Sequence, residues 1–218
     1  MQLPDGTRVG GVVLCGGKST RMGLPKATLP FGDELMLQRV VRLLGTAVTP
    51  IVVVAAGKQE IPKLPGDILM THDQREERGP LEGILAGLIA IATHADAAYV
   101  TSCDVPLLEP NFVRRMAELL AQNEIVVPFE AEFPHPLAAV YRVGVIERIE
   151  ALLSRDRLRP RFLFESSKTR LVPVDELRDA DPQLTTLRNL NHPQDYFSAL
   201  AAAGLTVAPS IRAQLSNA

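Results

Sequence analysis

The sequence contains no tryptophan and only two cysteines, and aromatic residues make up 5% of its 218 positions. The cysteines, Cys15 and Cys103, are too few for a disulfide framework or for a zinc site that spacing could reveal. No apolar run reaches the roughly 18 residues that a membrane-spanning helix needs. The opening segment, MQLPDGTRVGG, lacks the basic start and apolar core of a signal peptide. We therefore expect a cytoplasmic protein that does not contact a membrane.

The chain also lacks a strong net charge, because 23 basic residues oppose 25 acidic ones for a formal net charge of −2. This balance argues against nucleic acid as the partner, since nucleic-acid-binding surfaces are generally strongly basic. With 46% hydrophobic and 22% charged residues, the chain can bury a sizeable core and stay soluble. The length fits one domain. We expect that domain to span residues 1–208, followed by a polar, frayed segment over 209–218.

Short β-branched runs alternate with helical patterns along the chain. Four runs predict buried parallel strands because they are apolar on both faces, at Val9–Cys15, Pro50–Ala55, Asp67–Thr71 and Ala97–Cys103. Further strands are expected near 125–128 and 137–141. Helices are expected near 35–44, 81–92, 111–121, 145–153, 161–166 and 193–203. This alternation predicts an α/β fold with a doubly wound, mostly parallel sheet and helices on both faces.

The strongest motif is LCGGKSTRMGLPK, residues 14–26, which directly follows the first predicted strand. Open α/β sheets bind ligands at the carboxyl ends of their strands. Glycines let the backbone approach a phosphate closely, and Lys18, Arg21 and Lys26 add three positive charges. The segment is neither GxGxxG nor a complete Walker A motif, because Val12 takes the place of the first glycine. We therefore predict a phosphate-binding loop of another type.

This segment resembles the LAGGxSxRMGxxK signature of the molybdenum cofactor guanylyltransferases and related nucleotidyltransferases, with Cys15 in place of the usual alanine. The resemblance implies a Rossmann-like nucleotidyltransferase fold. It also implies nucleotide binding by Leu14, Cys15, Gly16, Gly17, Lys18, Arg21 and Lys26. Arg21 and Lys26 would then balance charge on the triphosphate. A nucleophilic Cys15 thiol is an alternative, but the sequence shows no paired base nearby, and Cys103 is interpreted as a small core residue.

Asp104 follows the predicted strand 97–103 in the segment YVTSCDVP. A triphosphate site needs a divalent cation, which is usually held by one or two carboxylates and by the phosphates. A carboxylate at the carboxyl tip of a buried strand suits that task, whereas the alternative is a turn cap before Pro106. The resembling enzymes have the same strand-Cys-Asp-x-Pro element, in which the Asp binds magnesium. We therefore expect Asp104 to hold Mg²⁺.

Asp73 lies just beyond the third predicted strand, where the resembling enzymes place an Asp that contacts the nucleotide; a turn cap is the alternative. Relatives can carry an asparagine after the second strand, but this chain has Ala-Ala-Gly at 55–57. That nucleotide contact is therefore missing or supplied otherwise.

The segment GPLEG, residues 79–83, opens a predicted helix with a proline near its start. It resembles the family's GPLAG element, which is associated with the guanine nucleotide. The resemblance assigns nucleotide contacts to Gly79, Pro80, Leu81 and Gly83. Glu82 replaces the usual alanine, and the sequence leaves open whether it faces the ligand or solvent. The preceding residues 75–78 are interpreted as a solvated loop.

The second half of the chain contributes residues to the acceptor side. His135 lies between two prolines, and a lone histidine is often structural. The resembling family has a comparable His-Pro element on its acceptor side, so His135 could meet the pterin's phosphate. The segment RNLNHPQDY resembles the family's closing NxNTPED motif, with Asn189 and Asn191 matching its asparagines, which can cap the last helix or line the cleft. The domain would then have a nucleotide half over about 8–130 and an acceptor half over about 131–208.

Four arginines alternate over residues 155–161, and Pro160 favours a loop there over a strand. This basic segment could meet an acidic acceptor or be a solvated loop, and an RNA-binding patch is a further alternative.

The resemblance extends from Leu14 to Tyr196 and implies transfer of GMP from GTP to the phosphate of molybdenum-molybdopterin, with release of pyrophosphate. The acceptor phosphate attacks the α-phosphorus, so positioning and charge neutralisation suffice without a protein nucleophile. The partners would be GTP, a molybdopterin-type acceptor and, further, molybdoenzyme apo-proteins or other cofactor-biosynthesis proteins. Alternatives are a molybdenum cofactor cytidylyltransferase, a sugar-phosphate or methylerythritol-phosphate nucleotidyltransferase, and a nucleotide- or cofactor-binding adaptor without catalysis. Both a monomer and a weak homo-oligomer remain open.

Overall fold

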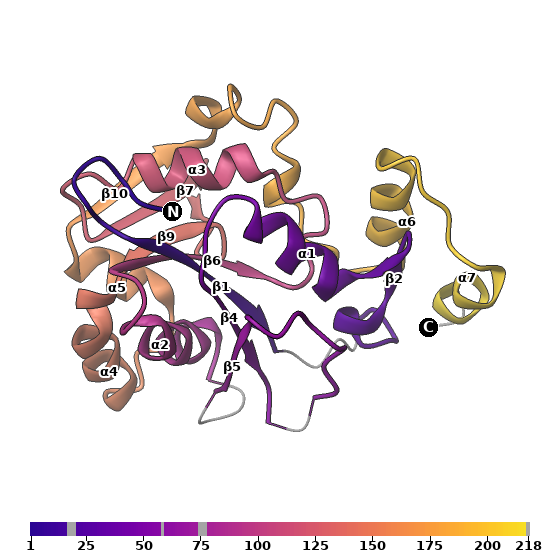
Figure 1. Cartoon of the computed structure of the whole chain (residues 1–218), viewed down its shortest axis with the longest axis horizontal. Helices are drawn as coiled ribbons and strands as arrows, with labels where there is room; N and C mark the ends of the chain where they lie inside the picture. Colours follow the sequence, from indigo (N-terminus) through magenta and orange to yellow (C-terminus); the bar gives the residue numbers. More distant parts are fainter. Residues whose placement is uncertain (17–20, 58, 74–77, 217–218) are drawn as a thin grey trace.

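The computed structural model describes residues 1–16, 21–57, 59–73 and 78–216, and within them an eight-stranded sheet forms the centre of the molecule (Figure 1). Seven strands follow the order β10-β7-β9-β6-β1-β4-β5, and β8 pairs with β7. These strands are β1 (Val9–Cys15), β4 (Ile51–Ala55), β5 (Leu69–His72), β6 (Ala97–Ser102), β7 (Ile125–Glu130), β8 (Phe133–Pro134), β9 (Ala139–Arg142) and β10 (Thr169–Pro173). A separate pair is formed by β2 (Pro30–Phe31) and β3 (Glu34–Leu35).

Most pairings in the central sheet are parallel. Strand β1 pairs in parallel with both β4 and β6, β4 pairs in parallel with β5, and β7 does so with β10. Strand β9 runs antiparallel to β6 and β7. The α/β fold with a mostly parallel sheet is therefore confirmed.

Helices cover both faces of the sheet, as the strand–helix alternation predicts (Figure 1). On one face are α1 (Met36–Gly45) and α3 (Pro110–Glu118), and on the other are α2 (Pro80–Ile91), α4 (Ile146–Ser154) and α5 (Pro160–Ser166). Beyond the sheet are α6 (Pro193–Ala202) and α7 (Pro209–Ser216). Short 3-10 helices span Lys26–Thr28, Val143–Val145, Val174–Leu177 and Thr185–Leu187. Five of the α-helices, α2, α3, α5, α6 and α7, begin with proline, whose fixed φ suits the first helical position.

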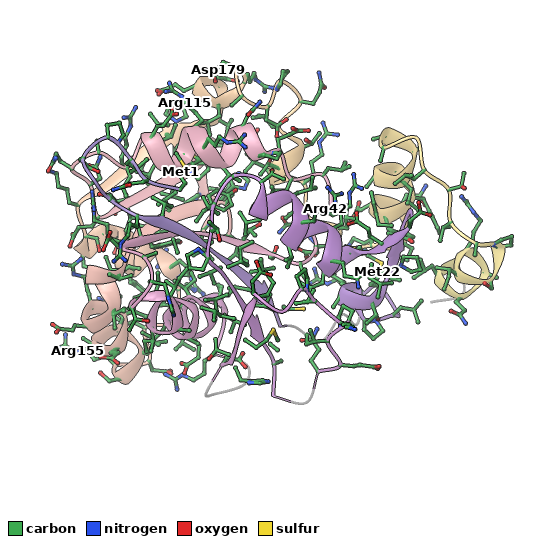
Figure 2. The ribbon with its side chains drawn as sticks, viewed as in Figure 1. Met1, Met22, Arg42, Arg115, Arg155 and Asp179 are labelled. Carbon is green, nitrogen blue, oxygen red and sulfur yellow. The ribbon has the colours of Figure 1, made fainter. Side chains whose placement is uncertain are left out.

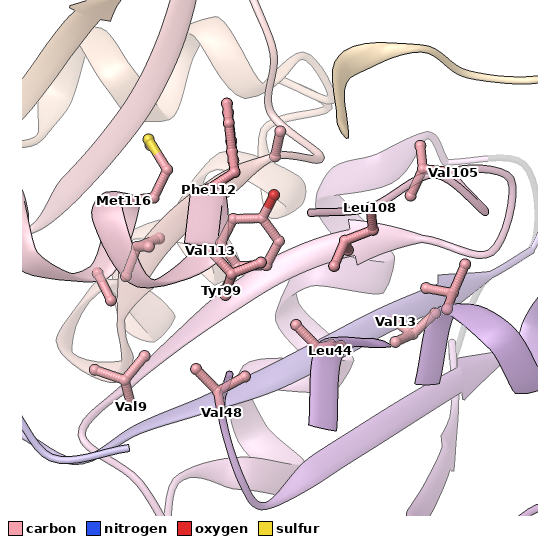
Figure 3. Packing of buried hydrophobic residues seen from close by; sticks show 14 of the residues in the cluster. Val9, Val13, Leu44, Val48, Tyr99, Val105, Leu108, Phe112, Val113 and Met116 are labelled. Atoms are coloured by element: carbon pink, nitrogen blue, oxygen red, sulfur yellow. The ribbon is translucent and has the colours of Figure 1, made fainter. Parts of the chain in front are cut away.

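Alternate residues of the strands point to opposite faces and so form two apolar cores. Figure 3 shows the first core, where Val9 and Val13 of β1 pack with Leu44 of α1 and with Phe112 and Met116 of α3. The second core lies on the other side. It joins Val12 and Leu14 of β1 to α2, α4 and α5.

A third apolar cluster connects the C-terminal helices to the segment after the phosphate loop. Met22 and Phe31 pack there with Tyr196 and Leu200 of α6. The cluster also contains Leu215, which is buried. The sequence predicts a frayed end from residue 209, whereas the structure has helix α7 over Pro209–Ser216. The burial of Leu215 against this cluster is the physical reason.

Strand β5 differs from expectation in its burial. It is predicted to be apolar and buried on both faces, but Met70 is 46% exposed because β5 is the last strand at one end of the sheet. Strand β10, at the other end, was not predicted. In the described part of the chain, no helix is long and apolar enough to cross a membrane.

Candidate functional site

The predicted phosphate loop begins at the carboxyl end of β1, in the middle of the sheet. Strand β1 lies between β4 and β6. The chain passes from β1 to β4 and β5 on one side and then crosses to β6 on the other side, and open α/β sheets bind ligands at such a switch point. Leu14 and Cys15 end the strand, and Gly16 follows it. Gly17 and Lys18 lie outside the described residues. Because β1, β4, β5 and β6 run parallel, their carboxyl ends lie along the same side of the sheet.

Three of the predicted site residues meet in one hydrogen-bonded group. The Nζ atom of Lys26 donates to Asp104 Oδ2 at 2.7 Å and to Asn191 Oδ1 at 3.0 Å. The side chains of Lys26 and Asp104 are 15% and 13% exposed, so this ion pair is mostly shielded from water. Residues from three separate motifs, 78 and 165 positions apart from Lys26, are thus brought together.

The Asp104 carboxylate is oriented by its own strand. Ser102 Oγ donates a hydrogen bond to Asp104 Oδ1, and the main-chain oxygen of Asp104 accepts from Leu190 N at 2.9 Å. Asp104 therefore sits at the tip of β6 as predicted, and its contacts bind it to the closing motif rather than cap a turn.

The closing motif orients Asn191 toward Lys26. Asp195 Oδ2 accepts from the backbone N–H groups of Asn191 and His192, at 3.0 and 2.8 Å, just before α6 begins. Because Asp195 accepts from these backbone N–H groups, the Asn191 side chain is not needed to cap them, and its Oδ1 atom accepts from Lys26 Nζ. The Asn191 side chain therefore contacts Lys26, and the cap of α6 is supplied by Asp195.

Arg21 is exposed at the start of the described segment 21–57, and its neighbour Met22 is fully buried in the third cluster (Figure 2). Tyr196 OH donates to the carbonyl oxygen of Pro30, which ties α6 to the same segment. Met22 and Tyr196 thus fix the segment that carries Arg21 and Lys26 onto α6.

Asp73 lies beside the loop at the end of β5. Its Oδ2 atom is 3.8 Å from the position that a Cβ atom on Gly16 would occupy, and its backbone N–H donates to Ala55 O at 3.4 Å. The neighbouring Ala56 Cβ is at the same 3.8 Å distance. A carboxylate and one small side chain, that of Ala56, therefore lie next to the first glycine of the loop.

The GPLEG segment begins α2 as predicted. Gly79 has a φ of 75°, in the left-handed region that favours glycine, and Pro80 is the first helical residue. Leu81 is fully buried, and a Cβ on Gly83 would lie 3.2 Å from Leu14 Cδ1. Contacts from Leu81 and Gly83 to a nucleotide would therefore come from the backbone, because these positions serve the packing of α2 against β1.

Glu82 does not face solvent. It is 6% exposed, and its Oε2 atom lies 3.8 Å from Arg78 Nε. Arg78 also donates to Leu153 O at 2.6 Å and lies 3.4 Å from Asp156 Oδ1, which links the start of α2 to the turn after α4. Residues 75–77 of the predicted solvated loop lie outside the described part of the chain.

The basic segment 155–161 forms that turn and the start of α5, so a loop is the correct prediction. Arg157 and Arg161 place their guanidinium groups over the Phe162 ring, 4.5 and 5.0 Å from its centroid. Arg155 lies at the edge of the molecule by α4, far from Met22 (Figure 2). Two of the four arginines, Arg157 and Arg161, therefore pack against a neighbouring aromatic ring of the same segment.

His135 and Asn189 line a common cavity of about 250 Å³, together with Leu137 and Thr186. A second cavity of about 310 Å³ shares His135 and also contains Arg188. Burial lowers the pKa of His135, although Glu130, whose Oε2 lies 3.9 Å from His135 Nε2, partly opposes the shift. His135 is thus mainly neutral at neutral pH and offers hydrogen bonds rather than charge.

The two cysteines lie side by side in the first core. Both are free thiols and buried. The hydrogen bond to Cys15 and burial raise the pKa of the Cys103 thiol. The structure agrees with the interpretation of Cys103 as a core residue and gives no support to a nucleophilic Cys15.

Several supporting residues were not identified from the sequence. Ser102 orients Asp104, Asp195 orients Asn191, and Met22 anchors the loop. Asp195 had a usable signal, since an acidic residue three positions after a helix cap commonly binds the cap backbone. Ser102 had none, because an isolated serine within an apolar strand has no distinctive pattern.

Among the described residues, no group of three or more His, Cys, Asp or Glu side chains could hold a metal ion by itself. A hard divalent cation here would need oxygen ligands from a bound phosphate in addition to the protein. Asp104 fits that requirement, since its carboxylate oxygens are oriented by Lys26 and Ser102 at the edge where the loop begins.

Comparison with known proteins gives consistent results. A family model described as the MobA-like NTP transferase domain matches residues 11–171. A Mycobacterium avium protein named probable molybdenum cofactor guanylyltransferase is 34% identical over 181 residues, covering 81% of this chain and 90% of that protein. The crystal structure of molybdopterin-guanine dinucleotide biosynthesis protein A from Archaeoglobus fulgidus has a TM-score of 0.73 at 20% identity, covering 90% of this chain and 98% of that one. A Mycobacterium tuberculosis protein crystallised with manganese has a TM-score of 0.54 at 20% identity, covering 77% and 88%.

Proposed function

Because the chain belongs to the MobA-like NTP transferase family, we propose that it transfers GMP from GTP to the phosphate of a molybdopterin-type acceptor and releases pyrophosphate. The names of its curated relatives support this reaction. The observation that carries the proposal is the meeting of Lys26, Asp104 and Asn191 at the switch point of the sheet.

In the proposed reaction, Lys26 and Arg21 offset the charge of the triphosphate. Lys26 is held by two oxygen acceptors, so its ammonium group is positioned before substrate binds and needs little reorganisation. The backbone after β1 approaches the phosphates at Gly16, where the next residues of the loop motif are Gly17 and Lys18.

We propose Mg²⁺ as the divalent ion, with Asp104 as its protein ligand. A bound Mg²⁺ would neutralise phosphate charge during transfer. The chain's own part is to hold the Asp104 carboxylate in place through Ser102 and Lys26. Asp73, next to Gly16, contributes a second carboxylate on the nucleotide side.

The acceptor is proposed to bind in the cavity lined by His135 and Asn189. Asn189 is two residues from Asn191, which connects this cavity to the Lys26 group along the closing motif. The neutral His135 can donate or accept a hydrogen bond with the acceptor's phosphate. The acceptor phosphate itself is the nucleophile, so no protein base is required.

Guanine is proposed to lie near the start of α2. The positive φ of Gly79 and the proline that follows fix the backbone there, so that main-chain groups can meet the base. The name guanylyltransferase, which the relatives carry, supports GTP rather than CTP as the proposed nucleotide of this chain.

The test is pyrophosphate release by the purified chain with Mg²⁺ and molybdopterin, compared among GTP, CTP and ATP. Acceptor-dependent release with GTP is the expected result. The same release with CTP alone would assign the cytidine reaction. Calorimetry then separates binding from turnover: nucleotide binding without release in the presence of acceptor would indicate an adaptor.

A further inference from the structure

Cys15 and Cys103 are 88 positions apart in the sequence but occupy neighbouring places in the sheet. Strands β1 and β6 are parallel, and the last pair in their register is Leu14 with Ser102. The ladder continues one step further, because Cys103 N donates to Leu14 O at 3.0 Å. Extending the register by one residue places Cys15 opposite Cys103.

The two thiols also point to the same side. Both belong to the first apolar core, and their side chains are close enough to hydrogen-bond. Neighbouring strands lie about 4.8 Å apart, which falls within the roughly 4.4–6.8 Å between Cα atoms that a disulfide spans. Gln59 Nε2 donates to Cys15 Sγ at 3.4 Å, so the loop after β4 contacts the same sulfur.

The position of this pair connects it to the proposed site. Cys15 is followed by Gly16, and Cys103 is followed by Asp104. A covalent change at the two sulfurs would therefore act on the start of the phosphate loop and on the proposed metal ligand together.

We propose that Cys15 and Cys103 are a site of reversible oxidation, at which a hydroperoxide converts the two thiols into a disulfide that disables nucleotide transfer. The existence of the disulfide is independent of the chain's activity, whereas its effect rests on the proposed function. Cys103 is 7% exposed and Cys15 is 0% exposed, so Cys103 is the thiol that peroxide can reach; because its raised pKa keeps it protonated, we expect its oxidation to be slow.

The chemistry balances with hydrogen peroxide as the oxidant. The Cys103 sulfur attacks one peroxide oxygen and the O–O bond breaks; the thiol proton leaves with the released oxygen as water, and a sulfenic acid remains. The Cys15 sulfur then attacks the sulfenic sulfur, and the S–O bond breaks. The departing hydroxide takes the Cys15 proton to form a second water. Two thiols are oxidised by two electrons, and one peroxide is reduced to two waters.

Disulfide formation requires movement at the site. Bonded sulfurs are about 2.05 Å apart, which is closer than two packed but unbonded thiols can lie. The sulfurs must approach, and the residues that follow them, Gly16 and Asp104, must adjust. Because misplacement of reacting groups by about 1 Å can lower turnover about 10²-fold, a loss of that order is expected.

The experiment treats the full chain with hydrogen peroxide and maps its peptides by mass spectrometry without reduction. A cross-linked peptide pair containing Cys15 and Cys103 is expected, lighter by two hydrogen atoms than the two reduced peptides. Mg–GTP affinity and pyrophosphate release are measured before oxidation, after it, and after dithiothreitol. We expect a loss of release of about 10²-fold that dithiothreitol reverses.

The variants Cys15→Ala and Cys103→Ala provide the controls, each compared with its own untreated sample. Both should keep their activity after a peroxide dose that inactivates the original chain, and neither should show the cross-link. Equal inactivation of the variants would overturn the proposal. So would intact or over-oxidised cysteines without a cross-link, a cross-link between two molecules, or a disulfide that leaves release unchanged. If the reduced chain binds no nucleotide, the proposed function fails, while the peptide map still decides whether the thiols pair.

Discussion

Replacement of Lys26 by alanine tests the centre of the proposed site. Lys26 Nζ contacts both Asp104 Oδ2, at 2.7 Å, and Asn191 Oδ1, at 3.0 Å. Removal of one positioned charge-stabilising donor typically lowers turnover by about 10²–10³-fold, or about 3–4 kcal/mol. We expect Lys26→Ala to lower acceptor-dependent pyrophosphate release by at least about 10²-fold. Asp104→Ala should have an effect of similar size.

The cost to stability should be smaller than the cost to activity. Breaking a fully buried ion pair costs about 3–5 kcal/mol, and exposed pairs contribute about 0–1 kcal/mol. With side chains 15% and 13% exposed, the Lys26–Asp104 pair lies between these limits, at about 1–3 kcal/mol. That is below the usual free energy of unfolding of about 5–15 kcal/mol, so the variant should remain folded.

Arg8→Ala is the matched control. It also removes a cation from an ion pair with an aspartate, Asp96, but at the amino end of β1 and with side chains 52% and 45% exposed. Its turnover should equal that of the original chain. Pyrophosphate release and thermal unfolding are measured for all variants. Full activity in folded Lys26→Ala would refute the role of Lys26, and equal losses in Arg8→Ala would show that the assay reports general destabilisation.

Three further results are expected. Asn191→Ala removes one acceptor of Lys26 and should lower turnover about tenfold with an unchanged melting temperature, which steady-state kinetics and thermal unfolding check together; unchanged kinetics would contradict this. Gly87→Ala would place a Cβ 2.3 Å from a core valine methyl group and should cost about 1–3 kcal/mol, whereas Gly66→Ala, with no atom within 4 Å, should leave the urea midpoint unchanged. Burial lowers the pKa of His135 below 6.5, so between this lowered pKa and pH 6.5 the unfolded chain binds more protons than the folded chain. The free energy of unfolding should therefore fall as the pH drops below about 6.5. His135→Gln should reduce that fall in urea titrations, and an identical pH profile would refute the assignment.

The sequence predicts the fold well where strands are buried. Strand β1 has the expected bounds, Val9–Cys15, since an apolar run in the centre of a parallel sheet is unambiguous. Strand β10, Thr169–Pro173, was missed because an outer strand alternates polar and apolar residues weakly and contains a proline. Helix α7 was missed because it has few apolar residues, and these stabilise the helix only by packing against α6 and the segment that contains Met22 and Phe31.

For the site, motif positions relative to the strands predict which residues gather at the sheet edge. Asp104 at the tip of β6 and Asp73 at the end of β5 follow directly from that rule. The direct contact of Lys26 with Asn191 could not be predicted, since it depends on how the segment before α6 packs against a residue 165 positions away. Likewise, the burial of Glu82 depends on Arg78 and the distant turn after α4.

Product identification by mass spectrometry, with GTP labelled at its α-phosphate, Mg²⁺ and molybdopterin, decides the proposed reaction. We expect the label in a dinucleotide formed from GMP and the acceptor, with unlabelled pyrophosphate as the other product. Release of the label as free GMP, or formation of the dinucleotide from CTP in place of GTP, would refute guanylyl transfer.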